Sequence, residues 1–172
     1  MFKQNQKGFT LIEIVVVMGI ISILAAIITI NVQSARQKSR NGKRRVDIIS
    51  LQAPLEAYYD ANKVYPNTNG NWWGIDVTYG SHDVYGQNGW IPNLAPTYIS
   101  RLPSDPLDNG AHRTYVYRSD TFNYKICALQ WPPDLTGNDG GVFNNPKDTF
   151  YDPLRPDHCW MVCSGEPACS SW

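Results

Sequence analysis

The sequence predicts an α+β fold: a long N-terminal helix, first apolar and then amphipathic, packed on a small antiparallel sheet, with a long loop between helix and sheet. Three observations support this. The run from Phe9 to Val32 has 24 residues and a single formal charge, Glu13. Apolar residues then recur at helical spacing between Val46 and Tyr58. Residues 114–129 alternate in polarity as two short strands would.

The apolar run is long enough to cross a membrane. At about 1.5 Å per residue it spans roughly 36 Å, against a hydrocarbon core of about 30 Å. A secretory signal peptide has an apolar core of only ~7 to 15 residues, so this run is too long for one. A carboxylate within such a helix costs on the order of 2.5 kcal/mol or more unless it finds a partner. We therefore expect Glu13 to be functional, the alternative being a charge tolerated near the interface.

The run begins after a basic leader that is followed by Gly8 and then by Phe-Thr-Leu-Ile-Glu, which ends at Glu13. This start resembles the class III signal of type IV pilins and type II secretion pseudopilins. The resemblance implies that a membrane peptidase removes residues 1–8 by cutting after Gly8 and then methylates the new amino terminus at Phe9. It also implies that Glu13 meets the terminal amine of a neighbouring subunit during assembly. Opposite charges attract far more strongly in that low-dielectric layer than in water.

The resemblance also implies a pilin-like fold and a set of partners. These are further copies in a helical filament, the prepilin peptidase, minor pilins or pseudopilins, the inner-membrane assembly platform and membrane lipid. The segments 47–51, 55–59 and 98–106 are similar to the head of major pseudopilins. The chain departs from that pattern at Ile30, where the family usually has proline, at Pro54, and in a longer tail over 131–172. The secretion, pilus and competence systems therefore stay open as alternatives.

Charge is segregated along the chain. Residues 36–45 carry six basic side chains and no acid, whereas residues 46–172 hold seven basic and fourteen acidic ones. Counting charges after the span would place the head in the cytoplasm. An even set of four cysteines and the family resemblance instead place it outside, anchored in the cytoplasmic membrane by one span. The basic block lacks interleaved aromatics, which argues against nucleic acid; we expect it to complement the acidic heads of neighbouring subunits or anionic lipid.

Beyond the span, an amphipathic helix is predicted over 33–64. Ile48, Leu51, Leu55 and Tyr58 form a packing face. Pro54 predicts a kink or a restart near Gln52, and the helix should end by Val64 because Pro66 follows.

The globular head, 65–172, is predicted to open with a long structured loop over 65–113 that carries many aromatic residues. We expect these to pack in the core, with Trp90 buried. The alternative function is a singly anchored envelope protein that binds glycans or protein partners through this loop.

A β-hairpin over 114–130 follows, with strands Thr114–Arg118 and Asn123–Leu129 and a turn at Ser119 and Asp120. The tail 131–172 is expected to be irregular and tied down by disulfides. The candidates are Cys127, Cys159, Cys163 and Cys169, which permit three pairings. Zinc held by His158 and the three later cysteines is the alternative, disfavoured by the adjacent His-Cys pair and the outside location.

The tail also holds a candidate calcium site. Asp134, Asn138 and Asp139 offer the oxygen ligands that calcium prefers, and some secretion pseudopilins bind calcium in such a loop. No strict calcium-loop spacing is met, so a solvated turn is the alternative and no other cofactor is expected. No phosphate loop or glycine-flanked serine nucleophile occurs, so the sequence does not predict an enzyme. The family resemblance implies a filament subunit.

Overall fold

The computed structural model describes residues 8–108, 113–130, 146–156 and 159–172. The chain divides into two compact units, one up to Ser39 and one from Arg40 to Trp172. Helix α1, Leu11–Ser50, supplies all the regular structure of the first unit and continues into the second.

The first unit is an apolar helix with its side chains exposed. Those of Leu11 through Leu24 are about half exposed or more, and among the described residues nothing covers them. By length and composition, this is a helix capable of crossing a membrane. An apolar surface of this extent requires lipid or another protein around it.

In the second unit, α1 ends at Ser50 and α2, Gln52–Asn62, begins two residues later. The restart predicted near Gln52 is confirmed. Pro54 lies in the first turn of α2, where a missing N–H leaves no intrahelical hydrogen bond unmade. Helix α2 ends before Val64, as predicted, because Lys63 adopts a left-handed conformation with φ 62° and its N–H donates to Tyr59 O at 2.6 Å.

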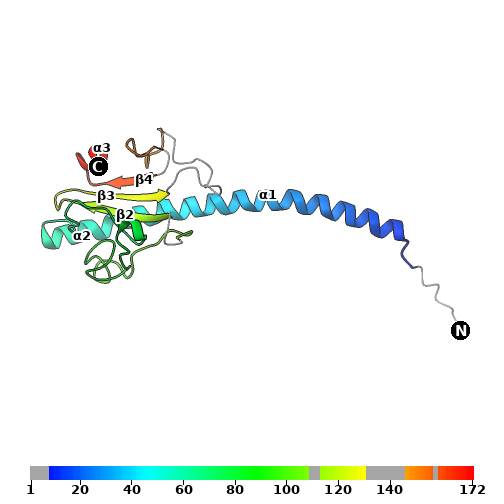
Figure 1. Ribbon diagram of the computed structural model, residues 1–172, viewed down its shortest axis with the longest axis horizontal. Coiled ribbons are helices and arrows are strands. Elements are labelled where there is room, and N and C mark those ends of the chain that lie inside the picture. The colour runs from blue at the N-terminus through cyan, green and yellow to red at the C-terminus, as the bar shows by residue number, and fades with distance from the viewer. Residues whose placement is uncertain (1–7, 109–112, 131–145, 157–158) are drawn as a thin grey trace. The chain divides into compact units, whose positions relative to one another are not determined.

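The sheet has four antiparallel strands in the order β1-β2-β3-β4. Strands β2, Arg113–Ser119, and β3, Tyr124–Gln130, form the predicted hairpin to within one residue at each end. Their register places Tyr115 opposite Ala128 and Val116 opposite Cys127. Figure 1 shows β2, β3 and β4 side by side.

Two parts of the prediction were incomplete. The loop before the hairpin contributes β1, Trp73–Gly74, which pairs with β2, and a 3-10 turn, Val77–Tyr79. The tail is not irregular throughout, since it forms β4, Cys159–Cys163, and α3, Ala168–Ser171. Strand β4 pairs with β3 from Leu129↔Cys159 to Lys125↔Cys163, so the tail extends the sheet.

Alternate residues of the hairpin enter two apolar clusters because successive side chains of a strand point to opposite faces. On one face, Tyr115, Tyr117 and Ile126 pack in a core that also holds the helix residues Ile48, Leu51 and Leu55. Burial of each aliphatic side chain contributes about 1.5–3 kcal/mol. The predicted helix face is therefore confirmed.

The opposite face of the sheet carries a smaller cluster. It contains Val116, Cys127, Leu129 and Cys159, with Trp72, Tyr79 and Met161 packed against it. The head therefore has apolar packing on both sides of its sheet, and the disulfide cysteines Cys127 and Cys159 belong to the second cluster.

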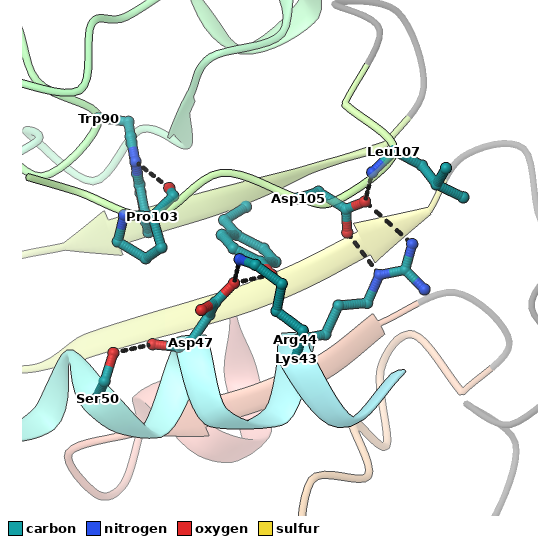
Figure 2. Close-up of polar contacts among 9 residues, drawn as sticks. Lys43, Arg44, Asp47, Ser50, Trp90, Pro103, Asp105 and Leu107 are labelled. Carbon is teal, nitrogen blue, oxygen red and sulfur yellow. Dashed lines mark hydrogen bonds and ion pairs between the residues drawn. The ribbon is translucent and has the colours of Figure 1, made fainter. Parts of the chain in front are cut away.

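Three of the six residues of the basic block form ion pairs within the second unit. Figure 2 shows Arg44 facing Asp105: Nε donates to Oδ2 at 2.5 Å and Nη2 to Oδ1 at 3.0 Å, with both side chains buried. Lys43 pairs with Asp47 at 2.5 Å, and Arg45 pairs with Asp148. The buried Arg44 is therefore not available to a neighbouring subunit, and complementarity between subunits stays a prediction for the rest of the block.

Candidate functional site

The first candidate site is the segment that leads into α1. Residues 8–10 lie outside regular structure, and the helix begins at Leu11. The space around Gly8 is open, since a Cβ built there would meet nothing within 4 Å among the described residues. The side chain of Phe9 is 85% exposed. The Gly8–Phe9 bond thus lies outside regular structure, with open space around it that a peptidase could enter.

Glu13 closes a capping box with Thr10. The backbone N–H and the hydroxyl of Thr10 both donate to Oε2 of Glu13 at 2.7 Å, and the Glu13 N–H approaches Thr10 Oγ1 at 3.4 Å. This reciprocal pattern satisfies donors that a helix start otherwise leaves open, and the carboxylate is favoured there by the helix dipole. Sequence reasoning missed this role of Thr10, although a threonine three residues before a glutamate is its usual signal.

The capping box gives Glu13 a partner within its own chain. Its neighbours on the helix surface are apolar: Phe9, Ile12, Ile14, Val16 and Val17. A cation created at Phe9, or brought by another chain, would find a fixed carboxylate in apolar surroundings. Chemically, the segment combines an exposed peptide bond with an anchored anion four residues further on.

The second candidate region is a buried polar cluster beside the Cys127–Cys159 disulfide. Lys125 and Asp152 are fully buried, with Nζ 3.0 Å from Oδ2, and Arg155 approaches the same oxygen at 3.3 Å. Lys125 and Arg155 also donate to the main-chain oxygen of Trp172, at 2.9 and 2.8 Å. Burial lowers the pKa of Lys125, and the hydrogen bond and ion pair with Asp152 oppose that shift.

The four cysteines form two disulfides, Cys127–Cys159 and Cys163–Cys169. The first joins β3 to β4, and the second connects the end of β4 to α3. As predicted, a tail cysteine reaches back to Cys127. His158 lies outside the described residues, but both bonds engage sulfurs that the zinc alternative required as ligands, so that alternative is wrong.

The described residues hold no metal site that fits. The sulfurs of Cys127 and Cys159 and a carboxylate oxygen of Asp152 lie within 4.8 Å of one another, but the sulfurs are joined in a disulfide and the cationic Lys125 lies beside the carboxylate. The calcium candidates Asp134, Asn138 and Asp139 lie outside the described residues.

The aromatic loop is mostly engaged in packing. Trp90 is fully buried, as predicted, and its Nε1 donates to Pro103 O at 3.2 Å. Trp73 stacks on His82 with ring centroids 4.0 Å apart. Trp72 lies against the guanidinium groups of Arg155 and Arg118, at 4.9 and 5.9 Å from its ring centre. These contacts argue against a free aromatic platform for sugars.

Comparison with known proteins agrees with the N-terminal geometry. Residues 3–29 match the family model described as prokaryotic N-terminal methylation motif. The chain is 35% identical over 106 residues to type II secretion system core protein G of Klebsiella michiganensis, covering 62% of this chain and 71% of that protein. It is 33% identical over 154 residues to the Dickeya chrysanthemi protein of the same name, covering 83% and 94%.

The likeness extends over nearly the whole chain in another relative. Type II secretion system core protein G of Pseudomonas aeruginosa is 33% identical over 158 residues, covering 88% of this chain and 99% of that protein. No solved structure matches the chain.

Proposed function

The chain belongs to the type II secretion system core protein G family, and on this premise we propose that it is a pseudopilin, a structural subunit of a helical filament assembled through its N-terminal helix. The methylation motif at residues 3–29 and relatives covered over 71% to 99% of their length support this proposal. We propose a structural rather than a catalytic role.

The observation that carries the proposal is the capped carboxylate at the head of an exposed apolar helix. Glu13 is held at the helix start by Thr10, four residues after the accessible Gly8–Phe9 bond. Cleavage at that bond would place an ammonium group at Phe9. We propose that the peptidase removes residues 1–8, that Phe9 is methylated, and that Glu13 of one copy receives the amine of the next.

The proposed location follows from the helix and the disulfides. The span would hold the chain in the cytoplasmic membrane over residues 9–32, with the helix continuing through 33–64 into a head, 65–172, outside the cytoplasm. Two disulfides in the head fit an oxidising compartment. The proposed partners are the prepilin peptidase, minor pseudopilins, the inner-membrane assembly platform and lipid. The rival function, a singly anchored envelope protein that binds glycans or protein partners through the aromatic loop, has little support from the packed tryptophans.

Processing tests the proposal directly. The full-length chain, expressed in a bacterium with a prepilin peptidase and purified from membranes, should show by intact-mass analysis the loss of residues 1–8 and the gain of one methyl group on Phe9. Gly8→Glu is the matched variant, and it should retain the leader because a charged side chain replaces the open space at the cleavage point. A wild-type chain that keeps its leader in these cells would contradict the proposed function.

A further inference from the structure

A continuous exposed face runs along the parts of α1 and α2 that lie in the second unit, Arg40–Trp172. Its residues recur at alternating intervals of four and three, which keeps them on one side of a helix. They are Gly42, Val46, Ile49, Ala53, Glu56 and Asp60, and all are exposed. The opposite side carries the buried residues Ile48, Leu51 and Leu55 at the same alternation, so the break between α1 and α2 does not disturb the pattern.

This exposed face, the docking face, changes character along its length. Its first part is apolar or small, with Val46 65% and Ile49 47% exposed. Its last part is acidic. Asp60 has no ion pair among the described residues, and Glu56 stays exposed while accepting a hydrogen bond from the Tyr65 hydroxyl at 3.0 Å. A matching partner would be a helix that is apolar for about two turns and then cationic.

The chain's own first unit has this pattern. Val17, Ile20, Leu24 and Ile27 recur at intervals of three and four, and all are about half exposed or more. The same series reaches Ser34 and Lys38 further along α1, both exposed, and Lys38 has no ion pair within the described part of the chain. The interval from Leu24 to Lys38 equals that from Val46 to Asp60.

We infer that the docking face receives the apolar helix of a further copy, other than the copy whose amine meets Glu13. The two helices lie in parallel register, with Leu24 opposite Val46, Ile27 opposite Ile49, and Lys38 opposite Asp60. This inference rests on the proposed filament function, because copies inserted in one orientation and extracted together stay parallel. The small residues Gly42 and Ala53 allow the helices to approach closely.

The charges decide the register. An apolar helix that leaves lipid must cover its surface, which favours any apolar contact regardless of alignment. One alignment of the two helices places Lys38 opposite Asp60 and Ser34 opposite Glu56. A shift of one residue would turn the contact face of a helix by about 100° and separate these pairs. Interfacial charge pairs generally act in this way, fixing partner and register.

Charge exchange between the two positions tests the inference in a bacterium that expresses the assembly system. The filament yield is the amount of chain in filaments sheared from cells, divided by the amount of mature chain in the membrane. Lys38→Asp and Asp60→Lys should each lower the filament yield about tenfold or more, and the double variant should restore it to within about threefold of wild type. Arg36→Asp is the matched control, because Arg36 lies two residues from Lys38, on the other side of the helix, and should assemble normally.

Covalent capture gives a second measurement that does not depend on yield. None of the described cysteines is free, so Lys38→Cys combined with Asp60→Cys adds the only new thiols in that part of the chain. A short bismaleimide reagent applied to filaments should produce a ladder of multimers, and the combination of Arg36→Cys with Asp60→Cys should not. Wild-type chains that form no filaments would contradict the proposed function. If wild-type filaments form, but the double charge variant does not restore the yield and the cysteine pair gives no cross-linked multimers, only the docking register would be overturned.

Discussion

Two charged side chains in this protein, Glu13 and Arg44, find hydrogen-bond partners within their own chain. Glu13 lies in an apolar segment, yet its Oε2 accepts two hydrogen bonds from Thr10. The buried Arg44 likewise binds Asp105 through two nitrogens and donates through Nη1 to Asn41 Oδ1 at 2.8 Å. Removing one member of such a buried pair leaves an uncompensated charge, so Arg44 acts in folding rather than between subunits.

Glu13 allows capping and charge to be separated experimentally. Glutamine at the third helix position can still close a capping box, but it carries no charge to receive an amine. If the charge matters, Glu13→Gln and Glu13→Ala should both insert and be cleaved normally while the assembled fraction falls more than tenfold, as expected for the loss of an ion pair in low dielectric. Sheared filaments and intact mass measure the two steps. Normal filaments from the glutamine variant would leave capping as the role of Glu13.

Among the elements, β4 depends most on covalent support. It lies at an edge of the sheet, pairs only five residues with β3, and is tied at both ends by disulfides. The Cys127–Cys159 bond closes 32 residues and joins adjacent strands, whereas Cys163–Cys169 closes only 6. A longer closed loop restricts the unfolded chain more, so the two bonds should contribute unequally to the free energy of unfolding.

Removing each disulfide in turn should reveal this difference. With alanine at both cysteines, loss of Cys127–Cys159 should lower the free energy of unfolding by about 3–4 kcal/mol, and loss of Cys163–Cys169 by about 2 kcal/mol, from the loop-entropy relation. Denaturant titration of the full chain in detergent, followed by tryptophan fluorescence, measures both. Equal effects would show that loop length does not govern the contribution of these bonds.

Local patterns in the sequence predicted most of the elements but few of the contacts between them. The spacing of Ile48, Leu51 and Leu55 predicted the packed helix face because periodicity reports burial directly. Strand β4 was missed because five residues between turn formers carry no clear alternation. The ion pairs of Arg44 with Asp105, 61 positions apart, and of Lys125 with Asp152 have no sequence signal, since each depends on the completed fold.

At the scale of the whole molecule, the head depends on tyrosines that must stay protonated. Tyr115 and Tyr117 are fully buried beside the helix residues, and Tyr124 is 1% exposed. Burial raises the pKa of Tyr124 to about 12 and those of Tyr115 and Tyr117 above their usual value. A hydrogen bond from the Tyr115 hydroxyl to Asp47 Oδ2 at 2.8 Å favours the neutral form further.

These shifts predict a head that loses stability at alkaline pH. A tyrosine whose pKa is raised by folding contributes fully below pH ~10, the value in the unfolded chain, and its contribution falls as pH rises toward the folded value. Tyr124 alone should lower the free energy of unfolding by about 1.4 kcal/mol between pH 9 and 11. Lys125 has a lowered pKa in the folded head, so its contribution to the free energy of unfolding rises with pH until the pH reaches the ordinary pKa of lysine. Above that pH its contribution no longer changes. Denaturant titrations at several pH values measure the loss.

Tyr124→Phe is the variant that isolates this contribution, because it removes the ionisable hydroxyl and keeps the buried ring. It should make the alkaline loss smaller by the share of Tyr124, whereas Tyr85→Phe, at a side chain 46% exposed, should leave the wild-type profile. If stability stayed level to pH 11, the buried tyrosines would have to ionise within the folded head at their ordinary pH. That would contradict the tight packing of the core between the sheet and the helices, on which the docking face depends.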